Sequence, residues 1–118
     1  MAPGRVVVCG NVVFDILARP VEEVRWEATT VVESVSQQLG GNAGSTSCTL
    51  GTLGIPVSIV TLAGRDAAAE TVMKRLRTAG VDLSLVQYVD APTSIAISLI
   101  RTRRSGRLKF SAPDRHVA

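Results

Sequence analysis

The hydrophobic pattern of the chain begins with a short, almost wholly apolar run. Residues 6–9 read Val-Val-Val-Cys and are followed by Gly10. A continuous β-branched run of this length is typical of a strand that is buried on both faces of a parallel sheet. Residues 57–62, Val-Ser-Ile-Val-Thr-Leu, have the same character. We therefore predict that these two runs are neighbouring buried strands of one parallel sheet.

Two stretches place their apolar side chains at helical spacing. In residues 43–53 small and apolar side chains recur every three or four positions, until Gly54 ends the pattern. The second stretch, residues 67–79, follows Asp66, which is its predicted N-cap. It ends before Gly80, the predicted first residue beyond the helix. The apolar stripe of this second helix, within 67–79, consists of Ala69, Val72, Met73 and Leu76.

The remaining apolar runs predict strands of a different kind. Residues 11–38 are broken by Pro20 and a charged patch, which favours peripheral strands over a core helix. Strands are also predicted over 83–89 and 94–100, and 107–111 is expected to pair with 94–100 across a Ser-Gly turn. Strand, extension, helix, strand, helix, strand is the order of an α/β fold with a mostly parallel sheet.

Composition and length limit the class of protein. With 118 residues the chain has room for one domain. Its 46% hydrophobic and 19% charged residues are ordinary for a soluble globular protein. No apolar run approaches the roughly 18–20 residues of a membrane span, and residues 1–5 are too short to begin a secretory signal. We expect a cytoplasmic protein without a membrane partner.

Charge and cysteine content exclude two further classes. The net charge is +3, but six of the thirteen basic residues lie between 101 and 115, and only four residues are aromatic. A solvated basic edge is therefore a better interpretation than a nucleic-acid surface. Cys9 and Cys48 have no metal-ligand spacing and no disulfide-rich context. We expect two buried free thiols and no metal site.

Two features carry candidate chemistry. Residues 40–46, Gly-Gly-Asn-Ala-Gly-Ser-Thr, place glycines directly before a helix, where a polar or anionic ligand can approach free backbone N–H groups. The segment lacks the lysine of a P-loop and the spacing of a dinucleotide fingerprint, and a glycine turn that permits close helix packing is the alternative. Asp15 follows the first strand, where open α/β sheets bind ligands, so it is a candidate acceptor for hydroxyl groups. Its alternative is a turn or exposed edge position.

Taken in order, these motifs resemble the start of the ribokinase or PfkB carbohydrate kinases. They are Val6-Val-Val-Cys-Gly-Asn with Asp15, Gly40-Gly-Asn-Ala, Leu50-Gly-x-Leu-Gly54, Gly64-Arg-Asp66 and Gly80-Val-Asp82. The resemblance implies a ribokinase-like three-layer α/β fold with a mostly parallel sheet and a small β lid, here truncated. Residues 1–118 would be its amino-terminal substrate-binding part, with lid segments at about 11–38 and 93–112.

The family transfers the γ-phosphate of ATP, with Mg²⁺, to a hydroxymethyl group of a sugar or nucleoside. The resemblance therefore implies a small-molecule partner. Ser45 stands where the family often has asparagine, and Thr93 and Ser94 would begin a lid strand over the substrate. The substrate-binding residues implied by the resemblance are Asp15, Gly40, Gly41, Asn42, Ser45 and Thr93.

One family motif does not occur in these residues. The Gly-Ala-Gly-Asp motif, whose aspartate is the family's general base, is missing, as is the ATP site built from the carboxyl half. We therefore assign no catalytic residue and no metal ligand, and expect that this chain alone neither binds ATP and Mg²⁺ nor acts as a competent kinase. A non-catalytic carbohydrate-binding or dimerisation module is the alternative. The resemblance also leaves open a homodimer formed through the β lid.

Overall fold

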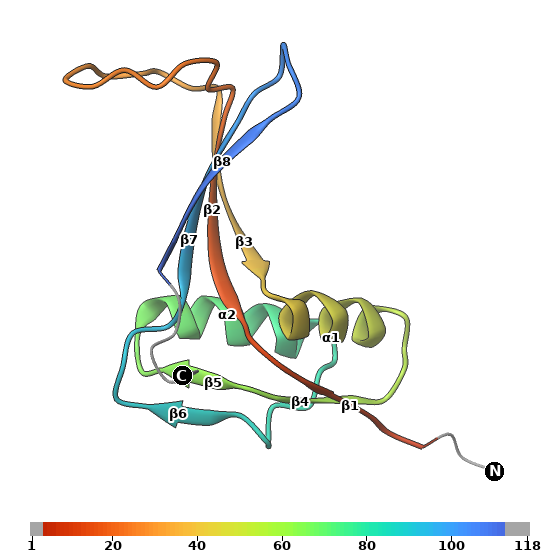
Figure 1. Cartoon of the computed structure of the whole chain (residues 1–118). Coiled ribbons are helices and arrows are strands. Elements are labelled where there is room, and N and C mark those ends of the chain that lie inside the picture. The colour runs from red at the N-terminus through yellow and green to blue at the C-terminus, as the bar shows by residue number, and fades with distance from the viewer. Residues whose placement is uncertain (1–3, 113–118) are drawn as a thin grey trace.

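The computed structural model describes residues 4–112 (Figure 1). Its elements confirm an α/β fold. In chain order they are β1 (Val6–Cys9), β2 (Val13–Arg19), β3 (Ser34–Gly40), α1 (Asn42–Thr52), β4 (Val57–Val60), β5 (Leu62–Gly64), α2 (Ala67–Thr78), β6 (Gln87–Val89), β7 (Ile95–Ile100) and β8 (Arg107–Ala112).

The lower part of the molecule, which we call the base, consists of β1, β4, β5, β6, α1 and α2 (Figure 1). β1 pairs with β4 in parallel, as predicted, and β5 pairs in parallel with β6. The two helices lie together over one face of these strands. Val57, Ile59 and Leu76 are completely buried between helices and strands. The core of the base is therefore a helix-on-sheet interface.

The prediction that β1 is buried on both faces is wrong. Val6, Val7 and Cys9 are exposed, and only Val8 is partly buried. β1 pairs only with β4 among the described strands, and the helices cover one face of this pair. The expectation of a buried thiol fails for Cys9 for the same reason, while Cys48 is half-buried and both cysteines are free.

A second sheet stands on the base and is called the projecting sheet here. Its strand order is β3-β2-β7-β8. β2 runs parallel to β7, whereas β2–β3 and β7–β8 are antiparallel pairs. Residues 20–33, which we call the arm, connect β2 to β3 and extend away from the top of this sheet (Figure 1). Residues 101–106 form the turn between β7 and β8, as predicted.

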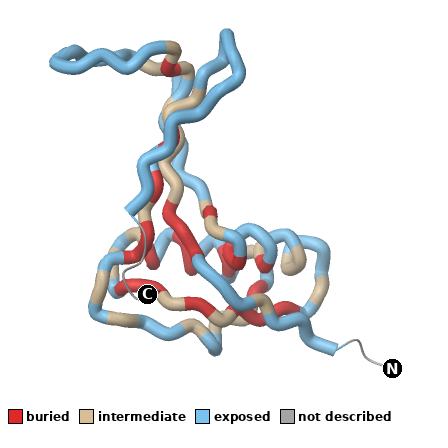
Figure 2. Tube along the Cα trace, viewed as in Figure 1, coloured by how far each residue is buried: buried red, intermediate tan, exposed pale blue. Residues whose placement is uncertain are grey.

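The strand register places most of the large apolar side chains of the projecting sheet on one face, the apolar face. Phe14 and Ile95, near the base, pack against the core there. Farther from the base the same face is open to solvent, and Phe110 is 56% exposed. Figure 2 shows this change from buried positions near the base to exposed ones above. Its exposed large side chains are Val35, Ile97, Leu108 and Phe110.

Candidate functional site

The glycine loop before α1 is fastened to the end of β1 by Asn11. Its side-chain Oδ1 accepts a hydrogen bond from the Asn42 N–H at 3.2 Å, and its carbonyl accepts from the Gly44 N–H at 3.2 Å. Gly41 has a positive φ of 84°, and a β-carbon there would lie 2.5 Å from the Asn11 carbonyl oxygen. Only glycine fits at position 41, because both the conformation and the space exclude a side chain.

Sequence reasoning did not select Asn11 as a site residue. The available signal was its position directly after Gly10, at the end of the first strand. In the structure Asn11 accepts hydrogen bonds from two of the first N–H groups of α1, those of Asn42 and Gly44. These two donors are therefore satisfied within the chain.

Asp15 lies in the middle of β2, in neither a turn nor an exposed edge. It is paired with Gln38 on β3 and with Ala96 on β7. A side chain at Gly40 would collide with the Asp15 carboxylate, so the glycine makes room for it. The Oδ1 atom of Asp15 is buried and has no hydrogen-bond partner within the described residues. A buried acceptor of this kind costs about 1–3 kcal/mol unless a donor reaches it.

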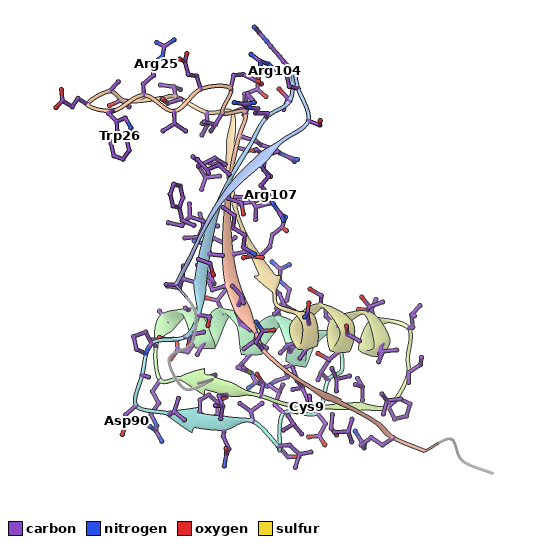
Figure 3. The ribbon with its side chains drawn as sticks, in the orientation of Figure 1. Cys9, Arg25, Trp26, Asp90, Arg104 and Arg107 are labelled. Carbon is purple, nitrogen blue, oxygen red and sulfur yellow. The ribbon has the colours of Figure 1, made fainter. Side chains whose placement is uncertain are left out.

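A cavity of about 630 Å³ lies at the carboxyl ends of β1 and β4. This is the edge at which open α/β sheets bind ligands. The cavity reaches the sheet face that carries Asp15, because Ser111 lines it and stands in the same register row as Asp15 and Ala96. Figure 3 labels Cys9 at its β1 side. Its lining residues are Cys9, Gly10, Asn11, Val12, Val13, Val60, Thr61, Leu62, Leu85, Gln87, Ser94 and Ser111.

The six predicted site residues do not all gather at this cavity. The structure brings Asp15 against Gly40, and Gly41 and Asn42 against Asn11. Ser45 instead lines a separate hollow of about 280 Å³, beside Cys48 and Arg75. None of the six lines the large cavity itself, although Ser94, the neighbour of Thr93, does.

Thr93 is buried, and its hydroxyl is used within the chain. It donates to Asp66 Oδ1 at 2.7 Å and accepts from the Gly64 N–H at 2.9 Å. The Thr93 N–H donates to Asp66 Oδ2 at 2.9 Å, while Asp66 Oδ1 also accepts from the Ala69 N–H, which confirms the predicted N-cap of α2. Thr93 thus joins the base to β7. Its role as a substrate contact stays a prediction.

The electrostatics of this junction follow from its hydrogen bonds. Partial burial raises the pKa of Asp66, but the bonds donated by Thr93 and Ala69 together outweigh burial, and the net pKa lies below the usual value for aspartate. The carboxylate is therefore charged at neutral pH, in the position where it also favours the positive end of α2.

Two other kinds of feature are absent from the described residues. Residues 4–112 contain no group of three or more His, Cys, Asp or Glu side chains placed to hold a metal ion. No helix within this range is long and apolar enough to cross a membrane.

The pfkB family carbohydrate kinase model matches residues 4–114. This chain belongs to the PfkB family. The family membership predicted from the ordered motifs is thereby confirmed. No curated protein matches the chain.

Solved structures show the PfkB chain's fold to be ribokinase-like. A protein from Agrobacterium tumefaciens is similar with a TM-score of 0.84 at 23% identity, over 96% of this chain and 37% of that one. Arabidopsis thaliana ribokinase complexed with ribose and ATP has a TM-score of 0.80 at 23% identity, over 95% and 36%. Xylella fastidiosa fructokinase with bound ATP has a TM-score of 0.75 at 19% identity, over 92% and 33%. The PfkB chain thus spans 33–37% of the length of these structures.

Proposed function

We propose that the chain is the amino-terminal, substrate-binding part of an ATP-dependent PfkB phosphotransferase that acts on a hydroxymethyl group of a sugar or nucleoside. The projecting sheet, within segments of about 11–38 and 93–112, would be its lid. The observation that carries this proposal is the buried, unpartnered Oδ1 of Asp15 beside Gly40. A polyol substrate supplies the missing donor.

Asp15 is suited to hydroxyl recognition because of its surroundings. A carboxylate has two acceptor oxygens and can receive hydrogen bonds from two adjacent hydroxyls. Gly40 on the neighbouring strand has no side chain, which leaves room for the carboxylate. The adjoining cavity of about 630 Å³ is in the size range of small-molecule sites.

ATP and Mg²⁺ would supply the phosphoryl group and charge neutralisation. The described residues hold no cluster of side chains fit for a metal, and the chain lacks the Gly-Ala-Gly-Asp motif. The role proposed for this chain alone therefore does not depend on ATP or Mg²⁺. We propose that the chain alone binds the acceptor and produces no phosphorylated product.

Pairing of two copies through the lid is the second part of the proposal. The exposed portion of the apolar face supports it, because a contiguous apolar surface on a soluble protein marks an interaction site. A small-molecule substrate, a cytoplasmic location and the absence of a nucleic-acid partner complete the proposal. The small number of aromatic residues, four in the chain, supports the last of these.

Calorimetry with ribose, other sugars and nucleosides tests the substrate site. Asp15→Ala is expected to weaken binding by about 1.5–3 kcal/mol, the range for hydrogen bonds to a charged group. Asp90→Ala is the matched control, because it removes a carboxylate whose side chain is 95% exposed and lies outside the site. Unchanged affinity in Asp15→Ala would remove Asp15 from the site and, with it, the main support for the proposal.

A further inference from the structure

A hollow of about 510 Å³ lies in the base between α2 and the edge strand β6 (Figure 1). We call it the α2 hollow. It shares no lining residue with the cavity at the carboxyl ends of β1 and β4, so the two are separate spaces. Its volume falls in the range of about 300–1,000 Å³ that is typical of small-molecule sites. The α2 hollow is therefore large enough for a ligand of its own.

The α2 side of this hollow combines buried apolar residues with exposed charged ones. Ala69 and Met73 are 2% and 3% exposed and form an apolar floor. Glu70, Lys74 and Arg77 are exposed and follow one another at spacings of four and three residues. These spacings place the three charged side chains on one side of the helix, next to the floor. A ligand in the hollow therefore meets all three.

The charged groups that follow β5 are already paired. Arg65 forms an ion pair with Asp90 and donates to the Tyr88 carbonyl at 3.3 Å. Figure 3 labels Asp90 just beyond β6. Both oxygens of the Asp66 carboxylate accept the hydrogen bonds of the junction described above. Neither Arg65 nor Asp66 is therefore free to be the main contact of a ligand.

The three charged groups on α2 are not paired in this way. Within residues 4–112 no ion pair includes Glu70, Lys74 or Arg77. A solvated helix face is the alternative, because cations favour the carboxyl end of a helix and Glu70 and Lys74 have the spacing of a surface pair. Arg75, another basic residue of the last turn, lies outside the hollow and donates to the Gln37 carbonyl at 3.5 Å. Lys74 and Arg77 instead line a concave surface with an apolar floor.

We propose that the α2 hollow binds a phosphate monoester that also carries hydroxyl groups. Its phosphate lies between Lys74 and Arg77, and its hydroxyls donate to Glu70. Side chains three residues apart on a helix begin about 5–6 Å from each other, so both cations can contact one phosphate. Phosphorylated sugars and nucleosides are the product class of the proposed phosphotransferase. Identifying the ligand as a product therefore rests on the proposed function.

The charges favour this ligand over its separate components. A bare phosphate ion is attracted by Lys74 and Arg77 but repelled by Glu70, which stands one helical turn from Lys74. A neutral sugar satisfies Glu70 and leaves both cations without an anion. A phosphate monoester with hydroxyls satisfies all three groups, because the carboxylate accepts from hydroxyls and the cations donate to phosphate oxygens.

The α2 hollow adjoins the junction between the base and the projecting sheet. Gly64 and Asp66 line it, and both are hydrogen-bonded to Thr93 just before β7. A ligand against residues 64–66 restricts this turn to its bonded geometry, so occupancy stabilises the junction. Under the proposed function, a product bound here holds the lid in one orientation and regulates the substrate site from outside it.

Calorimetry on the whole chain with ribose 5-phosphate tests the site. Lys74→Gln combined with Arg77→Gln is expected to weaken binding about 10-fold, because both contacts to the phosphate lose their charge. Arg103→Gln combined with Arg104→Gln removes the same charge at the tip of the β7–β8 hairpin, and this control is expected to leave the affinity unchanged. All four side chains are exposed, so the fold is preserved.

A second variant tests the role of the carboxylate by the sign of its effect. Glu70→Gln is expected to weaken ribose 5-phosphate binding about 3-fold, since an amide has one acceptor oxygen where the carboxylate has two. The same change is expected to strengthen the binding of inorganic phosphate, because it removes a repulsive charge. Equal shifts in the same direction for both ligands would overturn the placement of the hydroxyls on Glu70.

Hydrogen exchange tests the link to the junction. Saturating ribose 5-phosphate is expected to slow exchange about 5-fold at the Thr93 and Ala69 amides, which donate to Asp66. The effect is expected to be absent in the variant that combines Lys74→Gln with Arg77→Gln. Bound ligand without slower exchange at these two amides would overturn the regulatory part of the inference.

The outcomes separate this inference from the proposed function. Asp15→Ala is expected to weaken ribose binding and to leave ribose 5-phosphate binding unchanged. Ribose 5-phosphate that depends on Asp15 and not on Lys74 and Arg77, that binds equally weakly in the helix variant and the hairpin control, or that does not bind at all overturns the α2 site and leaves the kinase proposal standing. Ribose that fails to bind, beside ribose 5-phosphate that depends on Lys74 and Arg77, overturns the substrate site and supports the α2 site.

Discussion

The base buries its apolar side chains, whereas the projecting sheet leaves several of its own exposed. In the base, α2 covers the strands, and Leu76, Val72 and Ile59 are shielded on all sides. In the projecting sheet, Phe110 and Ile97 stand on the part of the apolar face that lies beyond the base and is open to solvent. Contacts within the base therefore account for the placement of its apolar side chains. The exposed part of the sheet's apolar face has no such covering layer within the described residues.

A matched pair of truncations tests this comparison most strongly. Leu76→Ala is expected to lower the free energy of unfolding by about 2–5 kcal/mol, because it leaves a cavity in the core of the base. Phe110→Ala, which removes a larger but half-exposed side chain, is expected to change it by no more than about 0.5 kcal/mol at concentrations where the chain is monomeric. Urea denaturation measures both. Equal losses would mean that the projecting sheet is stabilised like the base.

The junction between the two regions gives the next largest effect. Asp66→Ala removes the N-cap of α2 and the acceptor of both Thr93 bonds, and it is expected to cost about 0.5–2 kcal/mol. Thermal denaturation measures the loss. Ser84→Ala is a control in an exposed turn. A loss confined to α2, with unaltered protection of β7 amides from hydrogen exchange, would contradict a shared junction.

The lowered pKa of Asp66 predicts a pH dependence with a defined sign. Because the folded-state pKa lies below the unfolded value of about 3.9, the contribution of Asp66 to stability is complete above that value. It is lost as the pH falls through the folded pKa. In Asp66→Asn this part of the acid-induced loss is expected to vanish, which denaturation curves at stepwise lower pH can measure. An identical pH profile in both proteins would exclude Asp66 as the titrating group.

The smallest expected effect concerns the root of the arm. Glu22 accepts hydrogen bonds from the backbone of Thr102 and Arg103, and these bonds hold its pKa below the usual value. Glu22→Ala is expected to speed hydrogen exchange at these two amides while global stability is unchanged. Glu33→Ala, at the other end of the arm, is the control. Unaltered exchange at Thr102 and Arg103 would show that the turn holds its shape without the arm.

Local signals predicted the base better than the projecting sheet. The stripe on α2, its Asp66 cap and Gly80 are all set by neighbours in sequence, so the helix was predicted within one residue. The β7–β8 hairpin followed from its turn residues in the same way. The single run predicted over 57–62 is instead two strands separated by Thr61, and only Gln87–Val89 of the run 83–89 is a strand. Strand ends depend on pairing partners, which a local pattern does not specify.

Burial and site geometry depended on contacts between distant segments. The exposure of β1 could not be predicted, because an apolar run does not reveal whether a second layer covers it. Asp15 was selected from its position after the first strand, and its role in binding stays a prediction; its place between two strands and against Gly40 needs the register of β2 with β3. Asn11 was missed as a fastening residue because its partners, Asn42 and Gly44, are more than thirty residues away.

The Asp66 junction has a thermodynamic consequence for motion. One carboxylate serves both the first turn of α2 and the chain entering β7, and the Gly64 N–H depends on the same Thr93 hydroxyl. A tilt of the projecting sheet that pulls Thr93 away therefore breaks three hydrogen bonds together. Because the three bonds break together, even a small tilt costs the free energy of all of them. The orientation of the sheet is therefore expected to change between discrete states. Any ligand that favours one state must also shift the fraying equilibrium at the amino end of α2.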